Sequence, residues 1–173
     1  IENLGFRVLD SYRFTVSDPE GPAPSTLHVF DVELGPSLEA DVVASESRLA
    51  EALLAVRHGR AEDDRLNSLI LGAGLDWRQV SVLRTLAGYA FRVGAVVSRQ
   101  GAQRPLTSYP RCSRLLFEAF ETRFDPDFDG DREAAWRRIV RDFQDSLASV
   151  RGIEDDRTLR RLLKLILATQ RTN

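Results

Sequence analysis

The chain has one cysteine, no methionine and, among its 24 basic residues, a single lysine. The lone Cys112 cannot form an intrachain disulfide, which favours a reducing compartment and predicts a cytoplasmic location. Lysine-dependent catalysis is disfavoured because Lys164 is the only residue that could perform it. No apolar run approaches the roughly 18 residues that a membrane span requires, so we expect a soluble chain without membrane contact.

The sequence also lacks an excess of charge of either sign. Its 24 basic and 26 acidic side chains leave a formal net charge of -2, so no global positive field attracts nucleic acid. The hydrophobic share of 43% and the charged share of 29% are close to globular averages, and the length fits one domain or one domain plus a fragment. Without a methionine, a signal-like start or a helix-stopping residue at 171–173, the sequence is expected to be part of a longer polypeptide.

Two segments near the N-terminus have the composition of β-strands. In residues 5–16 the apolar side chains from Phe6 to Val16 share one parity, and a second such run covers residues 26–34. Residues 17–25 contain three prolines, which favours a long turn. The sequence therefore predicts an antiparallel hairpin. Because two strands alone are marginal in water, this hairpin needs a helix or further strands to cover it.

From residue 37 onward the apolar period is close to 3.6, which is typical of helices. The predicted helices cover residues 46–57, 66–73, 77–91, 115–124, 132–150 and 155–169. Gly59 and Gly74 are expected to close the first two, Asp76 to cap the third, and residues 101–110 to separate the third from the fourth.

The connections between these helices are short, which predicts antiparallel neighbours. The expected fold class is therefore α+β and predominantly α-helical. Residues 1–45 would form a partial β-hairpin unit, and residues 46–173 an antiparallel helical bundle.

The sharpest local motif is the acidic run at residues 125–131, which resembles the first half of a calcium-binding EF-hand loop. Asp125, Asp127 and Asp129 stand at alternate positions, but the twelfth position holds Trp136 instead of the bidentate glutamate. The alternative is an interhelical loop whose last aspartates favour the N-terminus of the next helix. The missing glutamate favours this second interpretation.

Other residues whose side chains or backbone could take part in catalysis or ligand binding have simpler structural interpretations. Gly72 and Gly74 lack the preceding strand and third glycine of a dinucleotide fingerprint, which favours a helix C-cap. His28 in a strand and His58 at a helix end have no metal-ligating partner at suitable spacing. A neighbouring arginine would lower the thiol pKa of Cys112, whereas burial would make the thiol inert, and burial is the favoured alternative.

The sequence also contains runs of charged residues. Two basic stretches on the last two predicted helices either bind a polyanion or form a solvated, ion-paired face, and the neighbouring acidic residues favour the second alternative. These basic residues are Arg137, Arg138, Arg141, Arg157, Arg160, Arg161 and Lys164. The run from Glu62 to Asp64 is interpreted as charge at a helix N-terminus. Taken alone, the residues predict no catalytic, cofactor-binding or metal-binding site.

Four motifs in the helical region resemble the same known family: AEDDRLN at 61–67, AGLDWR at 73–78, RFDP at 123–126 and EDDRTLRR at 154–161. They resemble the large bacterial NAD-dependent glutamate dehydrogenases. The opening ENLGFRVLD at 2–10 and LHVFD at 27–31 are similar to strands of an ACT-like regulatory unit in those enzymes.

The resemblance implies a non-catalytic regulatory or assembly segment of a long homo-oligomeric enzyme that oxidatively deaminates L-glutamate to 2-oxoglutarate with NAD. NAD and the catalytic lysine would lie outside this segment. Its partners would be the rest of the same polypeptide, other subunits and an amino-acid effector held by ACT-like units. The alternative is a stand-alone helical module that binds a partner helix or peptide in an apolar groove. A small enzyme built on Cys112 or on residues 125–131 is the least favoured hypothesis.

We predict that the purified chain neither binds NAD tightly nor reduces it with glutamate, because the residues that would do so are expected elsewhere. Absorbance of NADH in the presence of glutamate, together with calorimetric titration of NAD, checks this. Measurable turnover by the chain itself would contradict the assignment.

Overall fold

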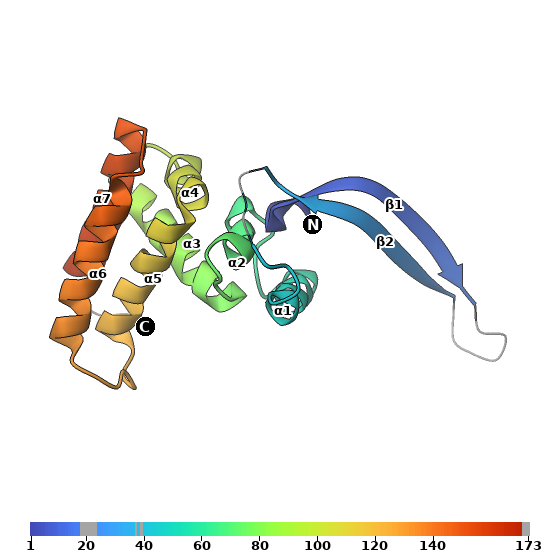
Figure 1. Cartoon of the computed structure of the whole chain (residues 1–173), viewed down its shortest axis with the longest axis horizontal. Helices are drawn as coiled ribbons and strands as arrows, with labels where there is room; N and C mark the ends of the chain where they lie inside the picture. Colours follow the sequence, from blue (N-terminus) through green and yellow to red (C-terminus); the bar gives the residue numbers. More distant parts are fainter. Residues whose placement is uncertain (18–23, 37, 39, 171–173) are drawn as a thin grey trace.

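The computed structural model describes residues 1–17, 24–36, 38 and 40–170. Strands β1 (Phe6–Val16) and β2 (Ser25–Leu34) form a two-stranded antiparallel hairpin that projects from a body of helices (Figure 1). Phe6 pairs with Leu34 at the base of the hairpin and Val16 pairs with Ser25 at its far end, which confirms the predicted strands and their pairing. Most of the predicted long turn lies outside the described residues.

A β-bulge at Leu9 divides the hairpin into an inner and an outer half. Val8 pairs with Val32, but Asp10 pairs with Asp31, so β1 contains one more residue than β2 at this point. Directly paired residues share a face, and faces alternate along each strand. The bulge therefore places the even-numbered apolar residues of outer β1 on the face opposite that of Phe6, together with Leu27 and Val29 of β2, whereas Phe30 of β2 stays on the face of Phe6.

Apolar residues of one parity in residues 5–16 thus lie on two different faces of the hairpin. The sequence of the second strand contains the corresponding signal, because its apolar residues change parity between Phe30 and Val29. The outer half presents Tyr12, Phe14, Val16, Leu27 and Val29 together, and we call this set the outer apolar face.

The helical body contains helices of very different length. Its α-helices are α1 (Glu46–Arg57), α2 (Leu69–Gly72), α3 (Trp77–Arg92), α4 (Arg99–Ser108), α5 (Pro110–Phe124), α6 (Arg132–Leu147) and α7 (Ile153–Ala168), and its 3-10 turns are η1 (Glu2–Leu4) and η2 (Arg65–Ser68). The α+β, predominantly helical class is confirmed, and α1 has the predicted bounds. Among the described residues, none of these helices combines the length and the hydropathy needed to cross a bilayer.

The start of α3 follows the predicted cap. Asp76 Oδ1 accepts hydrogen bonds from the backbone N–H groups of Arg78 at 2.7 Å and Gln79 at 2.9 Å. The Gln79 side chain in turn accepts from the Asp76 backbone N–H at 2.9 Å. This reciprocal capping box satisfies N–H groups that a helix start otherwise leaves without partners.

Two helical predictions are corrected by the structure. Residues 101–110 do not separate two helices, because most of them form α4, which begins at Ser98 as N-cap and tolerates Pro105 in its interior. Ala102, Pro105 and Leu106 are buried, and this packing outweighs the backbone hydrogen bond that proline removes. The single helix predicted at 66–73 is instead the 3-10 turn η2 followed by the short helix α2.

The hairpin is tied to the helical body at its base. Gly5 has a φ of 96°, and a Cβ at this position would overlap the Leu38 side chain. The Gly35 N–H donates to Gly5 O at 2.8 Å, closing the base. Asn3 Nδ2 donates to Asp63 Oδ1 at 2.9 Å, which connects the N-terminus to the segment before η2.

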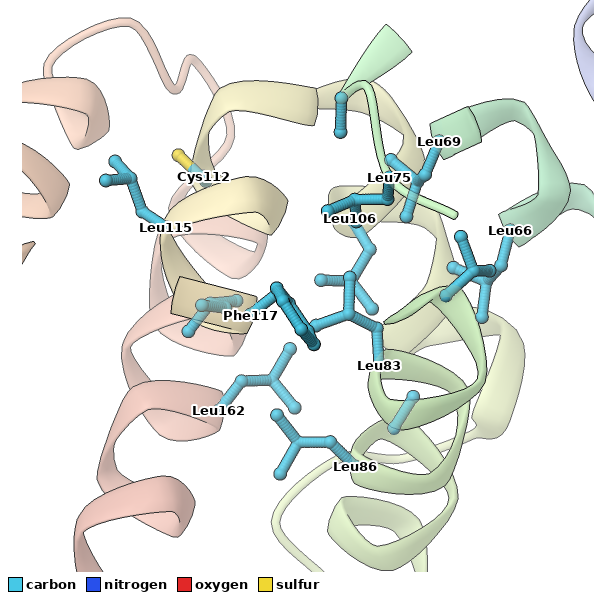
Figure 2. Packing of buried hydrophobic residues seen from close by; sticks show 14 of the residues in the cluster. Leu66, Leu69, Leu75, Leu83, Leu86, Leu106, Cys112, Leu115, Phe117 and Leu162 are labelled. Carbon is cyan, nitrogen blue, oxygen red and sulfur yellow. The ribbon is translucent and has the colours of Figure 1, made fainter. Parts of the chain in front are cut away.

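The hydrophobic core lies within the helical body, where α3, α4, α5 and α7 meet (Figure 2). Leu83 of α3 is fully buried, as are Leu106 of α4 and Leu162 of α7. Helix α6 covers α5, and the two lie side by side as a helical hairpin (Figure 1). In the described chain the outer half of the β-hairpin makes no part of this core.

We predict that Leu83→Ala lowers the free energy of unfolding by about 2–5 kcal/mol, because it leaves a cavity at a fully buried position. The control Leu54→Ala replaces a side chain that is 50% exposed, and its cost should stay below about 1 kcal/mol. Urea unfolding of both variants measures the difference. Equal losses would show that Leu83 is not part of the core.

Candidate functional site

The most highly organised group of polar residues is centred on Arg84 of α3. Its side chain is 11% exposed, and that of Asp64 is 20% exposed. Arg84 Nε donates to Asp64 Oδ2 at 2.8 Å, and a terminal nitrogen donates to Oδ1 at 2.9 Å. This bidentate geometry matches the planar fork of the guanidinium to the carboxylate.

Further acceptors surround the same guanidinium. Arg84 donates to Asn67 Oδ1 at 2.9 Å and to Ser81 Oγ at 3.2 Å. Asn67 itself is buried, and its Nδ2 donates to the Glu62 carbonyl oxygen at 3.0 Å. The arginine thus has acceptors on both of its terminal nitrogens and on Nε, which offsets the loss of water around a largely buried charge.

Asp64 has a second role in the same network. Its Oδ1 accepts from the Leu66 N–H at 3.1 Å, which caps η2, and its Oδ2 accepts from Gln103 Nε2 of α4 at 3.2 Å. The predicted role of Asp64 at a helix start is confirmed. Sequence reasoning missed its ion pair with Arg84, because the partners are 20 residues apart on different elements.

The acidic run at 125–131 is an interhelical loop that caps α6. Asp131 Oδ1 accepts from the N–H groups of Glu133 at 2.9 Å and Ala134 at 3.0 Å. Asp125 Oδ1 accepts from the Asp127 N–H at 3.0 Å. The interpretation as a helix start is confirmed, and within the described ranges no three His, Cys, Asp or Glu side chains are placed to hold one metal ion.

Cys112 is buried at the edge of the core (Figure 2), as the favoured interpretation predicted. Its Sγ lies 3.1 Å from Ser146 Oγ. Burial is the largest effect on this thiol and raises its pKa, outweighing the hydrogen bond to Ser146 and the charge of Arg111. The thiol is therefore neutral at neutral pH and is not an activated nucleophile.

The two histidines and Gly74 take the predicted places. His28 is exposed on β2 and stacks on Phe30 with ring centroids 6.3 Å apart. His58 follows the last residue of α1 as its C-cap. Gly74 follows α2 with a φ of 65°, next to Ala73, whose carbonyl oxygen accepts from Arg114 at 3.0 Å.

The basic stretches form ion pairs along their own helices, as predicted. These pairs are Arg137 with Glu133 at 2.5 Å, Arg157 with Glu154 at 2.7 Å and Arg160 with Asp156 at 2.8 Å. Arg161 donates instead to the Ala95 carbonyl oxygen at 3.1 Å. Because the three pairs are exposed and three or four residues apart, each contributes little to stability.

The sequence that forms these helices is similar to the sequences of known proteins. Residues 61–126 match the family model described as glutamate dehydrogenase, helical motif 3. The whole chain aligns with NAD-specific glutamate dehydrogenases from Halomonas elongata at 36% identity, Mycobacterium tuberculosis at 34% and Pseudomonas aeruginosa at 31%. The chain belongs to the NAD-specific glutamate dehydrogenase family.

The family match has a definite position in the fold. It runs from the segment before η2 to the loop after α5, and it includes Asp64, Asn67, Arg84 and Gln103. The chain spans 10% to 11% of the length of these three glutamate dehydrogenases. The Arg84 network is thus part of the glutamate dehydrogenase helical motif, and what it does chemically is to hold three elements together.

We predict a coupling energy of about 1–3 kcal/mol between Asp64 and Arg84 in a double-mutant cycle with Asp64→Asn and Arg84→Gln. The reason is that each single variant leaves a largely buried group without its charged partner. Urea unfolding of the four proteins gives the coupling.

The exposed pair Glu133 and Arg137 serves as the matched control for this cycle. The same cycle with Glu133→Gln and Arg137→Gln should give less than about 1 kcal/mol. A coupling between Asp64 and Arg84 as small as that of the control would contradict the structural role of the network.

Proposed function

We propose that this chain is a non-catalytic segment through which an NAD-dependent glutamate dehydrogenase is assembled and regulated. The whole enzyme would oxidatively deaminate L-glutamate to 2-oxoglutarate, with NAD bound outside this segment. The names of the relatives support the activity. A cytoplasmic location belongs to the same proposal, and the single cysteine, Cys112, supports it.

The outer apolar face is the observation that carries the assembly role. Its five side chains, at positions 12, 14, 16, 27 and 29, are between 39% and 56% exposed. Hydrophobic side chains gathered on one face of a two-stranded ribbon are typical of a surface that another element covers. The partner we propose is the rest of the same polypeptide or another subunit of a homo-oligomer, which would complete an ACT-like unit begun by residues 1–45.

The base of the hairpin supports a role in communication. Asn3 contacts Asp63, and the adjacent Asp64 contacts Arg84, so polar contacts lead from the hairpin base to α3. Leu38 packs close to both Gly5 and Gly72, which adds an apolar connection. Binding of a partner or of an amino-acid effector at the hairpin would be transmitted to the helical body, residues 46–173, through these contacts.

A stand-alone helical module that binds a partner helix is the second candidate function. A groove of about 660 Å³ between α3, the end of α7 and one residue of α5 favours it, because Val82, Leu86 and Phe120 give it apolar walls. Immunoblotting of the source cells distinguishes the two candidates. A band several times larger than 19.4 kDa supports the segment, and a band of 19.4 kDa supports the module.

We predict that Phe14→Ser with Leu27→Ser in the full-length enzyme disrupts assembly or lowers glutamate-dependent NAD reduction by at least about fivefold, an effect of about 1 kcal/mol. The two residues form a directly opposed pair on the outer apolar face. Light scattering gives the particle mass, and NADH absorbance gives the rate.

The neighbouring pair Arg13 and His28 lies on the opposite face and provides the matched control. Arg13→Ser with His28→Ser should leave particle mass and rate unchanged. In the 173-residue chain, neither double variant should shift the melting temperature appreciably, because all four side chains are exposed. If Phe14→Ser with Leu27→Ser changes neither particle mass nor rate, the proposed interface is wrong.

A further inference from the structure

A cavity of about 400 Å³ lies beside α3. Ser81, Arg84, Thr85, Gly88 and Tyr89 form its α3 wall. The other walls come from residues 60–62, which follow α1, and from the first turns of α4. Its volume lies within the range of small-molecule sites in proteins.

Positive charge gathers around this cavity. Arg60 lines it from the segment after α1, Arg84 and Arg92 from α3, and Arg99 from α4, and Glu62 is the one carboxylate among the lining residues. Arg84 has its own carboxylate partner in Asp64. In the described part of the chain, no carboxylate lies within salt-bridge distance of the other three arginines. The cavity is therefore electropositive in a chain whose formal net charge is -2.

One wall of the cavity is held rigidly. Ser81, Arg84 and Gln103 line it and are also members of the hydrogen-bonded network around Asp64. Their side chains are thus fixed before any ligand arrives, which reduces the entropy that binding would cost. Tyr89 adds an exposed hydroxyl group that can donate a hydrogen bond to an anion, whereas the Thr85 hydroxyl donates to the Ser81 carbonyl oxygen at 2.9 Å.

Gly88 is an unusual residue for the middle of a helix. A Cβ at this position would meet no other atom within 4 Å, so packing does not require a glycine. Glycine in a helix interior is less stable than alanine, because its backbone loses more freedom on folding. Its effect here is to leave the α3 wall of the cavity free of a side chain.

We propose that this cavity binds a small anion that carries two or more carboxylate or phosphate groups. Guanidinium groups recognise both kinds of oxyanion, and arginines on separate elements can contact separate charged groups of one ligand. The inference goes beyond the assembly role and does not rest on it, because it depends only on the cavity and its lining.

Calorimetric titration of the 173-residue chain with citrate and, separately, with inorganic pyrophosphate tests the site. Ionic strength is kept constant with chloride, because salt screens exposed charges. We expect saturable binding of at least one probe. Binding of citrate alone indicates a carboxylate ligand and binding of pyrophosphate alone a phosphate ligand, whereas failure of both probes to bind at millimolar concentration overturns the proposal.

Two double variants of equal charge locate the binding. Arg92→Gln with Arg99→Gln should raise the dissociation constant by about tenfold or more, because each removes a direct charge contact. Arg138→Gln with Arg141→Gln changes the net charge equally on exposed positions of α6, outside the cavity lining, and should leave the constant within about twofold of the parent value. Equal weakening by both pairs would show non-specific attraction and overturn the site.

Substitutions at Gly88 provide a test that does not alter charge. Gly88→Phe should abolish binding by filling the cavity, whereas Gly88→Ala should retain binding and raise the melting temperature by about 2–4 °C. Circular dichroism confirms that both variants are folded. Undiminished binding by folded Gly88→Phe would place the anion elsewhere and overturn the proposal.

Discussion

The bidentate contact between Arg84 and Asp64 determines how the helical body is arranged. One carboxylate accepts from α3, from α4 through Gln103 and from the first turn of η2. Apolar packing alone tolerates small shifts between helices, since hydrophobic contacts have little direction. A largely buried guanidinium does not tolerate them, because any shift removes acceptors that replace its lost water. The network therefore fixes the relative positions of three elements whose apolar faces meet in the core.

The Arg84 network lies between the hairpin and the arginine-lined cavity, the two surfaces for which a function is proposed. On one side Asp64 follows Asp63, which binds Asn3 at the base of the hairpin. On the other side Ser81 and Gln103 form part of the arginine-lined cavity. A segment that spans about a tenth of the length of its relatives contributes to the larger polypeptide through its surfaces, and here the two surfaces share a rigid support.

Features with local causes could be predicted from the sequence. The helix cap at Asp76 lies within one helical turn and was predicted, as was the ion-paired face of the last two helices, to which the pair of Arg160 and Asp156 belongs. Features that depend on tertiary packing could not. The helix through Pro105 contradicts its own local signals and is stabilised by burial, and the pairing of Arg84 with Asp64 follows no spacing rule. The candidate site was missed for this reason, although the motif at 61–67, which contains Asp64 and Asn67, was recognised.

The bulge at Leu9 affects which residues of the hairpin can be substituted during evolution. Because of the bulge, the outer apolar face lies on the side of the hairpin opposite that of Phe6 and Leu34, which pack against the helical body, and is available to a different neighbour. Substitutions in the outer half do not disturb the core, so selection can alter them to follow changes in a partner. Phe6 and Leu34 have no such freedom, since both pack against the core of the helical body.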